Sequence, residues 1–203
     1  MKYTTEPLVV SDLFDADTYK TILRFMTDWV PKLPWPNDSY QPDKRPMFGR
    51  RFGTNVPFFA EIHQQLAEYA SDLFDEEVKP SYSFLSMYDD NGTCPLHIDR
   101  PQCRYTIDYL IRQEQAEPWP ICIGPQMNKK QHAARRGELS PFSDEEREHL
   151  IETVNWTTVD LKPNDAVCYS GTHAWHYRPE PCQGTADLVF FHFVPKGFRG
   201  DLD

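Results

Sequence analysis

The spacing of apolar residues divides the chain into a helical first third and a strand-rich remainder. Apolar side chains recur at the spacing of one helix face in residues 15–30: Tyr19, Ile22, Leu23 and Met26. Asp15 or Asp17 can cap the first turn of that helix. A second helix is predicted over residues 57–74, with Pro57 in its first turn.

Beyond residue 80 the pattern changes to short runs that are rich in β-branched and aromatic residues and are separated by turns. The predicted strands cover residues 82–88, 96–99, 104–111, 119–123, 156–161, 166–169, 174–178 and 186–194. Residues 31–46 hold five prolines and are expected to form an extended loop. Helices followed by about eight strands predict an α+β fold whose strands close into a barrel or sandwich.

One polar stretch interrupts the predicted strands. Basic residues gather in residues 125–137: Lys129, Lys130, His132, Arg135 and Arg136. A helix is expected to follow from Ser143, which matches a capping box with Glu146. Residues 125–152 therefore look like an insertion between two strands. The insertion is either a lid that attracts an acidic substrate or an ordinary solvated loop.

Length and composition favour a single folded domain. The chain has 203 residues, of which 39% are hydrophobic and 14% aromatic, enough for one substantial core. We expect residues 1–79 to give helical support and residues 80–195 to form the β core.

Charge and cysteine content restrict the partners and the compartment. The formal charge of −10 and a pI of about 5.1 disfavour nucleic acid and anionic membranes as partners. No stretch approaches the roughly 20 apolar residues of a membrane span, and residues 1–10 lack a secretory signal. The five cysteines have no paired spacing: Cys94, Cys103, Cys122, Cys168 and Cys182. A reduced, cytoplasmic protein is the simpler interpretation.

Two histidines and one aspartate are the strongest candidates for chemistry. His97 and Asp99 are separated by one residue, and a distal histidine, His173 or His176, lies in the segment 171–176. Two neutral imidazoles and a carboxylate can hold Fe(II) on one face and leave the other positions open for substrate, cosubstrate and oxygen. An isolated His-x-Asp pair also occurs by chance, so a surface turn pair and a core histidine are the alternative.

Strand alternation chooses between the two distal histidines. In a strand, residues i and i+2 share a face, so the two members of the His-x-Asp pair point the same way. On an inward-facing strand at 174–178, His176 shares its face with Ala174 and Arg178, whereas His173 points outward. Alternation therefore favours His176 as the third ligand.

The segments around these residues resemble the double-stranded β-helix (jelly-roll) oxygenases that depend on 2-oxoglutarate and Fe(II), especially the small prolyl-hydroxylase-like members. The matching segments are SMYDDNG at 86–92, RYTIDYL at 104–110, LKPNDA at 161–166 and FFHF at 190–193. The resemblance covers residues 82–194 and implies a jelly-roll core with the N-terminal helices packed on one sheet.

The resemblance implies His97, Asp99 and His176 as the iron ligands and catalytic residues, with 2-oxoglutarate and O2 as cosubstrates. Tyr88, just before the first turn, is a candidate cosubstrate-binding residue. Related halogenases replace the carboxylate ligand with a small residue, and this chain keeps Asp99. Hydroxylation, desaturation or ring closure of a small metabolite, amino acid or peptide-like substrate is therefore implied.

The anchor for the far carboxylate of 2-oxoglutarate departs from the family pattern. Family members commonly carry Arg or Lys nine or ten residues after the distal histidine, where this chain has Thr185 and Ala186. A buried carboxylate needs a cationic partner. Arg178 is the first substitute because alternation places it on the inner face, and Arg104 and Arg112 are the others.

Several further residues have two interpretations. Arg45, Arg50 and Arg51 either line a substrate entrance or make ordinary surface pairs. His192, between two phenylalanines, is expected to be a core or surface histidine rather than a fourth ligand. Two rival functions stay open: a metalloenzyme of the same fold that uses no ketoacid, and a non-catalytic jelly-roll binding module.

Overall fold

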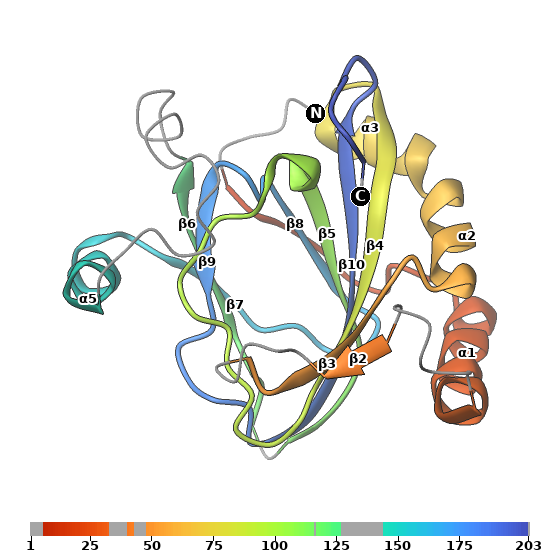
Figure 1. Ribbon diagram of the computed structural model, residues 1–203, viewed down its shortest axis with the longest axis horizontal. Helices are drawn as coiled ribbons and strands as arrows, with labels where there is room; N and C mark the ends of the chain where they lie inside the picture. The colour runs from red at the N-terminus through yellow and green to blue at the C-terminus, as the bar shows by residue number, and fades with distance from the viewer. Residues whose placement is uncertain (1–5, 33–39, 43–47, 116, 127–143, 203) are drawn as a thin grey trace.

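The computed structural model describes residues 6–32, 40–42, 48–115, 117–126 and 144–202. Two antiparallel sheets face each other across a packed interior, and helices cover the outer face of the larger sheet (Figure 1). The predicted α+β fold class, a double-stranded β-helix with N-terminal helices on one sheet, is confirmed.

The larger sheet has seven strands that come from the whole length of the chain. Their spatial order is β1 (Leu8–Val10), β8 (Ala166–Tyr169), β5 (Tyr105–Gln115), β10 (Gly184–Pro195), β4 (Val78–Tyr88), β3 (Arg50–Thr54) and β2 (Tyr40–Pro42). β10 pairs along most of its length with β5 on one side and with β4 on the other. These long central strands form the main wall of the barrel.

The smaller sheet has three strands in the order β7 (Thr157–Val159), β6 (Ile121–Gln126) and β9 (Ala174–Tyr177). A backbone bridge between His97 and His176 joins the chain after β4 to β9. The strand predicted over residues 96–99 is therefore only a single bridge. Pro95 has no N–H to donate, and the N–H of Asp99 bonds to Gly171 instead of continuing the ladder.

Alternation along β5 separates the two faces of the larger sheet. Ile107, Tyr109 and Ile111 are buried under the helices, whereas Leu110 packs inside the barrel. Asp108 lies on the same inner face as Leu110 and lines a cavity. The outer face of the sheet thus packs against the helices, and the inner face lines the barrel interior.

Three helices pack on the outer face: α1 (Ala16–Arg24), α2 (Pro57–Gln65) and α3 (Ala67–Phe74). Asp15 caps α1 by accepting hydrogen bonds from the N–H groups of Asp17 and Thr18. α1 continues into a π-helical turn at Phe25–Trp29, so the helix predicted over residues 15–30 is confirmed. The single helix predicted over residues 57–74 was wrong in one respect, because the chain breaks at Leu66.

The first third also contributes β1, β2 and β3, which the sequence pattern did not predict. β1 and β2 lie at the two edges of the larger sheet and have three residues each, too few to show alternation. β3 pairs with β4, a partner from a later part of the chain, so its conformation is set by tertiary pairing.

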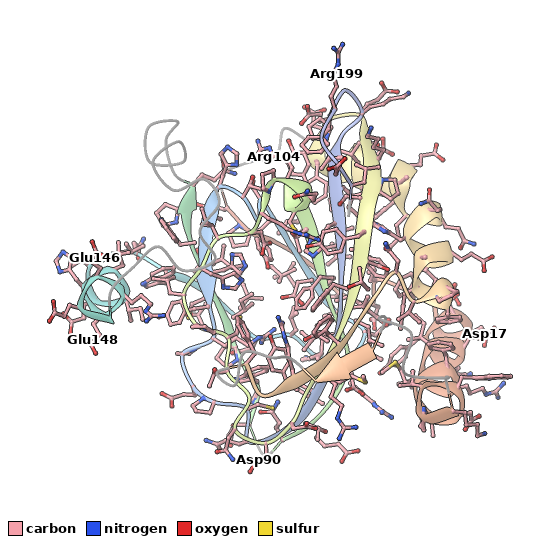
Figure 2. The ribbon with its side chains drawn as sticks, in the orientation of Figure 1. Asp17, Asp90, Arg104, Glu146, Glu148 and Arg199 are labelled. Atoms are coloured by element: carbon pink, nitrogen blue, oxygen red, sulfur yellow. The ribbon has the colours of Figure 1, made fainter. Side chains whose placement is uncertain are left out.

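A further helix, α5 (Asp144–Thr153), lies on the opposite side of the barrel from α1, α2 and α3 (Figure 1). Its charged residues Glu146 and Glu148 are exposed on the outer surface, as is Asp17 of α1 (Figure 2). The basic stretch at residues 129–136, interpreted as a lid or a solvated loop, and the cap at Ser143 lie outside the described residues.

All five cysteines lie within the described ranges, are buried and form no disulfide. No helix in the described part of the chain is long and apolar enough to cross a membrane.

Candidate metal centre

The fold brings together the three residues that the sequence nominated as metal ligands. The Nε2 atoms of His97 and His176 each lie 3.7 Å from Oδ1 of Asp99. The two imidazole rings are 4.2 Å apart between centroids, and one ligand atom from each of the three residues lies within 4.8 Å of the others. These three side chains therefore converge on one point at the barrel interior.

Backbone hydrogen bonds fix the direction of both imidazoles. His97 and His176 exchange N–H···O=C bonds of 3.1 and 3.0 Å across the bridge. The Nδ1 atom of His97 lies 2.8 Å from the carbonyl oxygen of Pro95, and that of His176 lies 3.0 Å from the carbonyl oxygen of Ala174. Because Nδ1–H bonds to a carbonyl, Nε2 carries the lone pair, as metal binding requires.

Gly171 packs directly against the carboxylate of Asp99. The carbonyl oxygen of Gly171 accepts the N–H of Asp99 at 2.9 Å. A Cβ added at Gly171 would lie 2.2 Å from Oδ2 of Asp99 and 2.7 Å from the carbonyl oxygen of Cys103. No side chain fits there. Sequence reasoning assigned Gly171 no role, although it begins the segment that holds the distal histidine.

Mutual electrostatics put two of these groups in the protonation state of metal ligands. Burial would raise the pKa of Asp99, but the two imidazoles, His176 before His97, bring it well below its usual value. Burial, with His176 nearby, lowers the pKa of His97 to about 3. Burial lowers the pKa of His176, but the Asp99 carboxylate outweighs this and raises it. Asp99 is thus an anion and His97 is neutral at pH 7.

The donor set fits a divalent transition metal. Two imidazole nitrogens and one carboxylate oxygen, all on one side of a point, are the arrangement that suits non-haem Fe(II). A metal ion here would bind the Nε2 lone pairs of both imidazoles and a carboxylate oxygen, so metal binding would compete with protonation of His176.

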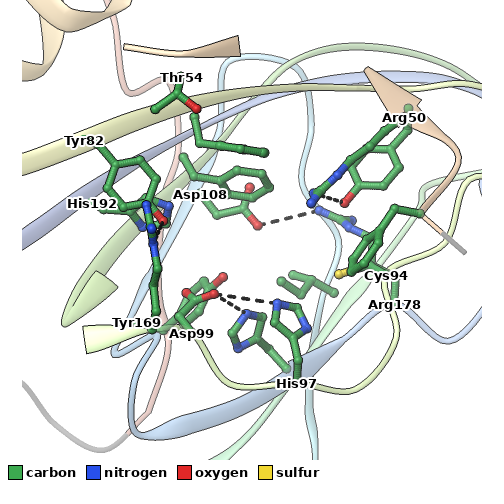
Figure 3. A pocket seen from close by; sticks show the side chains of 17 residues that line it. Arg50, Thr54, Tyr82, Cys94, His97, Asp99, Asp108, Tyr169, Arg178 and His192 are labelled. Atoms are coloured by element: carbon green, nitrogen blue, oxygen red, sulfur yellow. Dashed lines mark hydrogen bonds and ion pairs between the residues drawn. The ribbon is translucent and has the colours of Figure 1, made fainter. Parts of the chain in front are cut away.

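The three ligand candidates line a cavity of about 410 Å³, a volume typical of small-molecule sites. Figure 3 shows His97 and Asp99 on one side of this cavity and Asp108 with Arg178 across from them. The apolar part of the lining is mainly aromatic: Phe48, Phe84, Tyr88, Tyr169 and Phe190.

Arg178 lines the cavity, where alternation predicted it. Its side chain is 5% exposed, stacks at 4.4 Å on the Trp119 ring and donates to the carbonyl oxygen of Trp119. Its Nη2 lies 3.7 Å from Oδ2 of Asp108. The cation is therefore fixed in direction, two residues beyond His176 on the same inner face.

The other two arginine candidates lie outside the cavity. Arg104 bonds to Ser170 and lies 2.7 Å from Nδ1 of His173, so both Arg104 and His173 are committed to a cluster apart from the cavity lining. Arg112 donates to Asp187 at 2.6 Å. Simple alternation would place Arg112 on the inner face with Asp108 and Leu110. A register shift next to the Arg112–Asp187 pair reverses this, so Arg112 lies beside Asp187 on the outer face.

Tyr88 and Arg50 lie together in the cavity wall. Nη1 of Arg50 donates to the Tyr88 hydroxyl at 2.9 Å, and its guanidinium lies over the rings of Phe48 and Phe84 at 4.5 and 5.1 Å. Arg50, for which a substrate entrance and an ordinary surface pair were both open, lines the cavity. Arg45 lies outside the described residues.

Two further cavity residues had no predicted role in the site. Asp108 of β5 is fully buried, and Arg100 lies 4.3 Å over the Tyr82 ring while its Nε donates to the Tyr82 hydroxyl. His192, expected to be a core or surface histidine, also lines the cavity, with Nδ1 3.0 Å from the Thr106 hydroxyl. Strand alternation is the sequence signal that could have identified Asp108. It lies two residues before Leu110 and therefore on the same inner face.

No protein-family model and no curated protein matches this chain. Solved structures share its fold. HygX from Streptomyces hygroscopicus, with nickel, 2-oxoglutarate and hygromycin B bound, is 14% identical; the match covers 96% of this chain and 85% of HygX, with a TM-score of 0.63. EctD from S. alaskensis with bound Fe is 13% identical, with 97% and 75% covered and a TM-score of 0.70.

SnoK, a non-heme alpha-ketoglutarate-dependent carbocyclase from nogalamycin biosynthesis, is 9% identical, with 93% and 79% covered and a TM-score of 0.68. At such identities the likeness shows the fold. The fold predicted from the sequence resemblance to 2-oxoglutarate- and Fe(II)-dependent oxygenases is therefore confirmed.

Proposed function

We propose that this protein is an Fe(II)- and 2-oxoglutarate-dependent oxygenase that oxidises an unactivated C–H bond of a small molecule. The observation that carries the proposal is the convergence of His97, Asp99 and His176 in a cavity whose opposite wall holds the buried cation Arg178. The shared fold with HygX, EctD and SnoK supports it, since those proteins bind iron or nickel, or use the ketoacid.

Each residue has a distinct task in this proposal. His97, Asp99 and His176 hold the iron and leave its cavity side open. When bound, iron, 2-oxoglutarate and O2 supply an oxidant that removes hydrogen from carbon, while the ketoacid becomes succinate and CO2. Arg178 binds the far carboxylate of the ketoacid and so fixes its orientation. The aromatic lining excludes water from the reacting atoms.

The charges in the cavity favour a substrate that carries an anionic group. Arg50, Arg100 and Arg178 line it, against Asp99 and Asp108, which gives 3 − 2 = 1 positive charge. The charges of bound Fe(II) and of the 2-oxoglutarate dianion would cancel, so the positive charge stays for the substrate. We therefore propose a small metabolite, amino acid or peptide-like substrate with a carboxylate or similar group.

Two observations leave room for the rival functions. Thr185 and Ala186 stand where the family has its cation, and Arg178 already has a carboxylate beside it. A metalloenzyme of the same fold that uses no ketoacid is consistent with both. The non-catalytic binding module predicts no metal affinity at all.

Incubation of the purified protein with Fe(II), ascorbate and 2-oxoglutarate tests the proposal. We expect succinate to form, with formation abolished by His97→Ala and kept by His173→Ala, which changes a histidine outside the cavity. Tight Fe(II) binding without turnover or binding of 2-oxoglutarate would support the metalloenzyme that uses no ketoacid. Failure to bind any divalent metal would support the binding module.

A further inference from the structure

Asp108 is the one described cavity residue with fully buried side-chain oxygens that have no hydrogen-bond partner. Its side chain is fully buried, and neither carboxylate oxygen has a hydrogen-bond partner among the described residues. The nearest charge is Arg178, whose Nη2 at 3.7 Å is beyond hydrogen-bond length. A buried carboxylate without hydrogen bonds is costly. A ligand that satisfies it would therefore gain affinity.

The position of Asp108 creates a conflict of charge at the far end of the cavity. Arg178 is the cation that the proposed function assigns to the far carboxylate of 2-oxoglutarate, and Asp108 lies directly beside Arg178 (Figure 3). A ketoacid carboxylate on Arg178 would thus approach a second carboxylate in a buried site. Repulsion between two carboxylates in a buried site raises the pKa of one of them, so ketoacid binding favours protonation of Asp108.

We propose that Asp108 takes up one proton from solvent when 2-oxoglutarate binds, and donates a hydrogen bond to the far carboxylate of the ketoacid beside Arg178. Arg178 and protonated Asp108 together then replace the basic residue that is missing at Thr185 and Ala186. This inference rests on the proposed use of 2-oxoglutarate. It assigns Asp108 of β5 as a further residue that contacts the ketoacid, and it predicts that one proton is taken up when the ketoacid binds.

The surroundings of Asp108 support protonation of this group rather than of a neighbour. Burial raises the pKa of Asp108 to about 6, although Arg178 lowers it, and a bound anion would raise it further. The titratable and charged groups that influence Asp108 come from three other parts of the barrel: Arg178 and His176, Tyr169 and Cys168, and Asp99 and Cys94.

Most of these neighbours cannot accept the proton instead. Burial raises the pKa of Tyr169, Cys168 and Cys94, so all three already hold their protons near pH 7. Asp99 and His176 are proposed to be occupied by the metal. Asp108 is therefore the group whose protonation changes when an anion arrives.

Calorimetric titration of 2-oxoglutarate into the Fe(II)-loaded protein, without oxygen, measures the proton directly. The heat is recorded at pH 7.5 in two buffers with different ionisation enthalpies. We expect uptake of about one proton per ketoacid in the wild type and almost none in Asp108→Asn. Above the pKa of Asp108 the wild-type Kd should rise about tenfold per pH unit, while that of Asp108→Asn stays nearly constant.

Asp187→Asn is the matched control, because Asp187 is also a mostly buried carboxylate paired with an arginine, Arg112, but on the outer face. It should keep the proton uptake of the wild type. Binding without proton uptake, or equal uptake in Asp108→Asn, overturns the inference and leaves the proposed function standing. An Asp108→Asn variant that binds the ketoacid normally but no longer turns over substrate assigns Asp108 to a substrate ammonium or hydroxyl group, which also overturns it.

Absence of any ketoacid binding by the wild type overturns the proposed function itself, and with it this inference. If Asp108→Asn does not fold, the proton count and the pH dependence of the wild type and of Asp187→Asn still decide. No proton uptake in either protein then overturns the inference.

Discussion

The two ends of the cavity are built in different ways. At the metal end, His97 and His176 are held by the backbone of their own segments and by each other, and every Nδ1 has a carbonyl partner. At the far end, Arg178 directly follows β9 and Asp108 belongs to β5, and the carboxylate has no hydrogen-bond donor among the described residues. The first end has its donors already oriented, whereas the second has a buried carboxylate whose oxygens lack a donor among the described residues.

This difference has a consequence for function. A site whose donors are already oriented binds its metal without rearrangement, which favours affinity. A site with an unsatisfied buried group is specific, because it rewards only the ligand that satisfies that group. In the proposed function, the metal end therefore determines the chemistry, and the far end selects the ketoacid.

The largest effect is expected at the metal end. His176→Ala should lower metal affinity and 2-oxoglutarate turnover by more than about 100-fold, since loss of even a supporting partner of a metal ligand costs 10–100-fold. Metal titration and succinate formation measure both. His173→Ala, three residues away and outside the cavity, should stay near the wild type. Equal loss in both variants would mean that the histidines only stabilise the fold.

At the far end, Arg178→Ala should raise the Kd of 2-oxoglutarate about 30-fold or more while Fe(II) binding stays unchanged. The change also leaves Asp108 buried without its cation, which destabilises the fold. The double variant Arg178→Ala/Asp108→Asn should regain the stability and not the affinity. Arg104→Ala is the control, because Arg104 lies outside the cavity. Weaker ketoacid binding in Arg104→Ala would contradict the assignment of Arg178 as the residue that binds the far carboxylate.

A smaller loss of metal affinity is expected from a substitution at Gly171, which packs against Asp99. In Gly171→Ala the new Cβ would displace the Asp99 carboxylate, so metal affinity should fall about tenfold. Gly197→Ala is the control, since a Cβ there meets no atom within 4 Å. Metal titration of the two variants compares them. Unchanged metal affinity in Gly171→Ala would show that Asp99 does not need this support.

The smallest expected effect is the loss of folding stability at low pH caused by His63, which is separate from the pH dependence of ligand binding. His63 packs on Phe193 at 4.6 Å on the outer face, and burial lowers its pKa to about 3. Between pH 6.5 and 3 the unfolded chain therefore binds a proton that the folded chain does not, so stability falls as the pH falls. At pH 5 this costs on the order of 1–2 kcal/mol.

His63→Phe should remove that part of the pH dependence. Urea unfolding at pH 7 and pH 5 measures it, and the proton uptake on 2-oxoglutarate binding should be unaffected. A variant that loses as much stability as the wild type between these two pH values would contradict the assignment to His63.

The metal end could be predicted from the sequence because its determinants are local. His97 and Asp99 lie within three residues, and strand parity was enough to prefer His176 over His173. The same parity placed Arg178 on the inner face. The α+β fold class followed from the change between helical and strand periodicity near residue 80.

The rest depends on contacts that the sequence pattern does not show. Arg50 enters the cavity only because β3 pairs with β4, and β3 itself is too short to be recognised. In the sequence, Asp108 is only a polar residue within an apolar strand. Its role depends on Arg178, which the fold of the barrel places beside it. Arg104 was a reasonable anchor by position, but it lies just before β5 and bonds to Ser170 instead.

The most direct test of the account is the binding of 2-oxoglutarate with and without Fe(II), measured by calorimetry in the absence of oxygen. We predict one ketoacid per chain in the presence of Fe(II). Binding should be much weaker without the metal and in either His176→Ala or Arg178→Ala, and unchanged in Arg104→Ala. Fe(II) binding without ketoacid binding, or ketoacid binding that survives both substitutions, would contradict the claim that the two ends form one site.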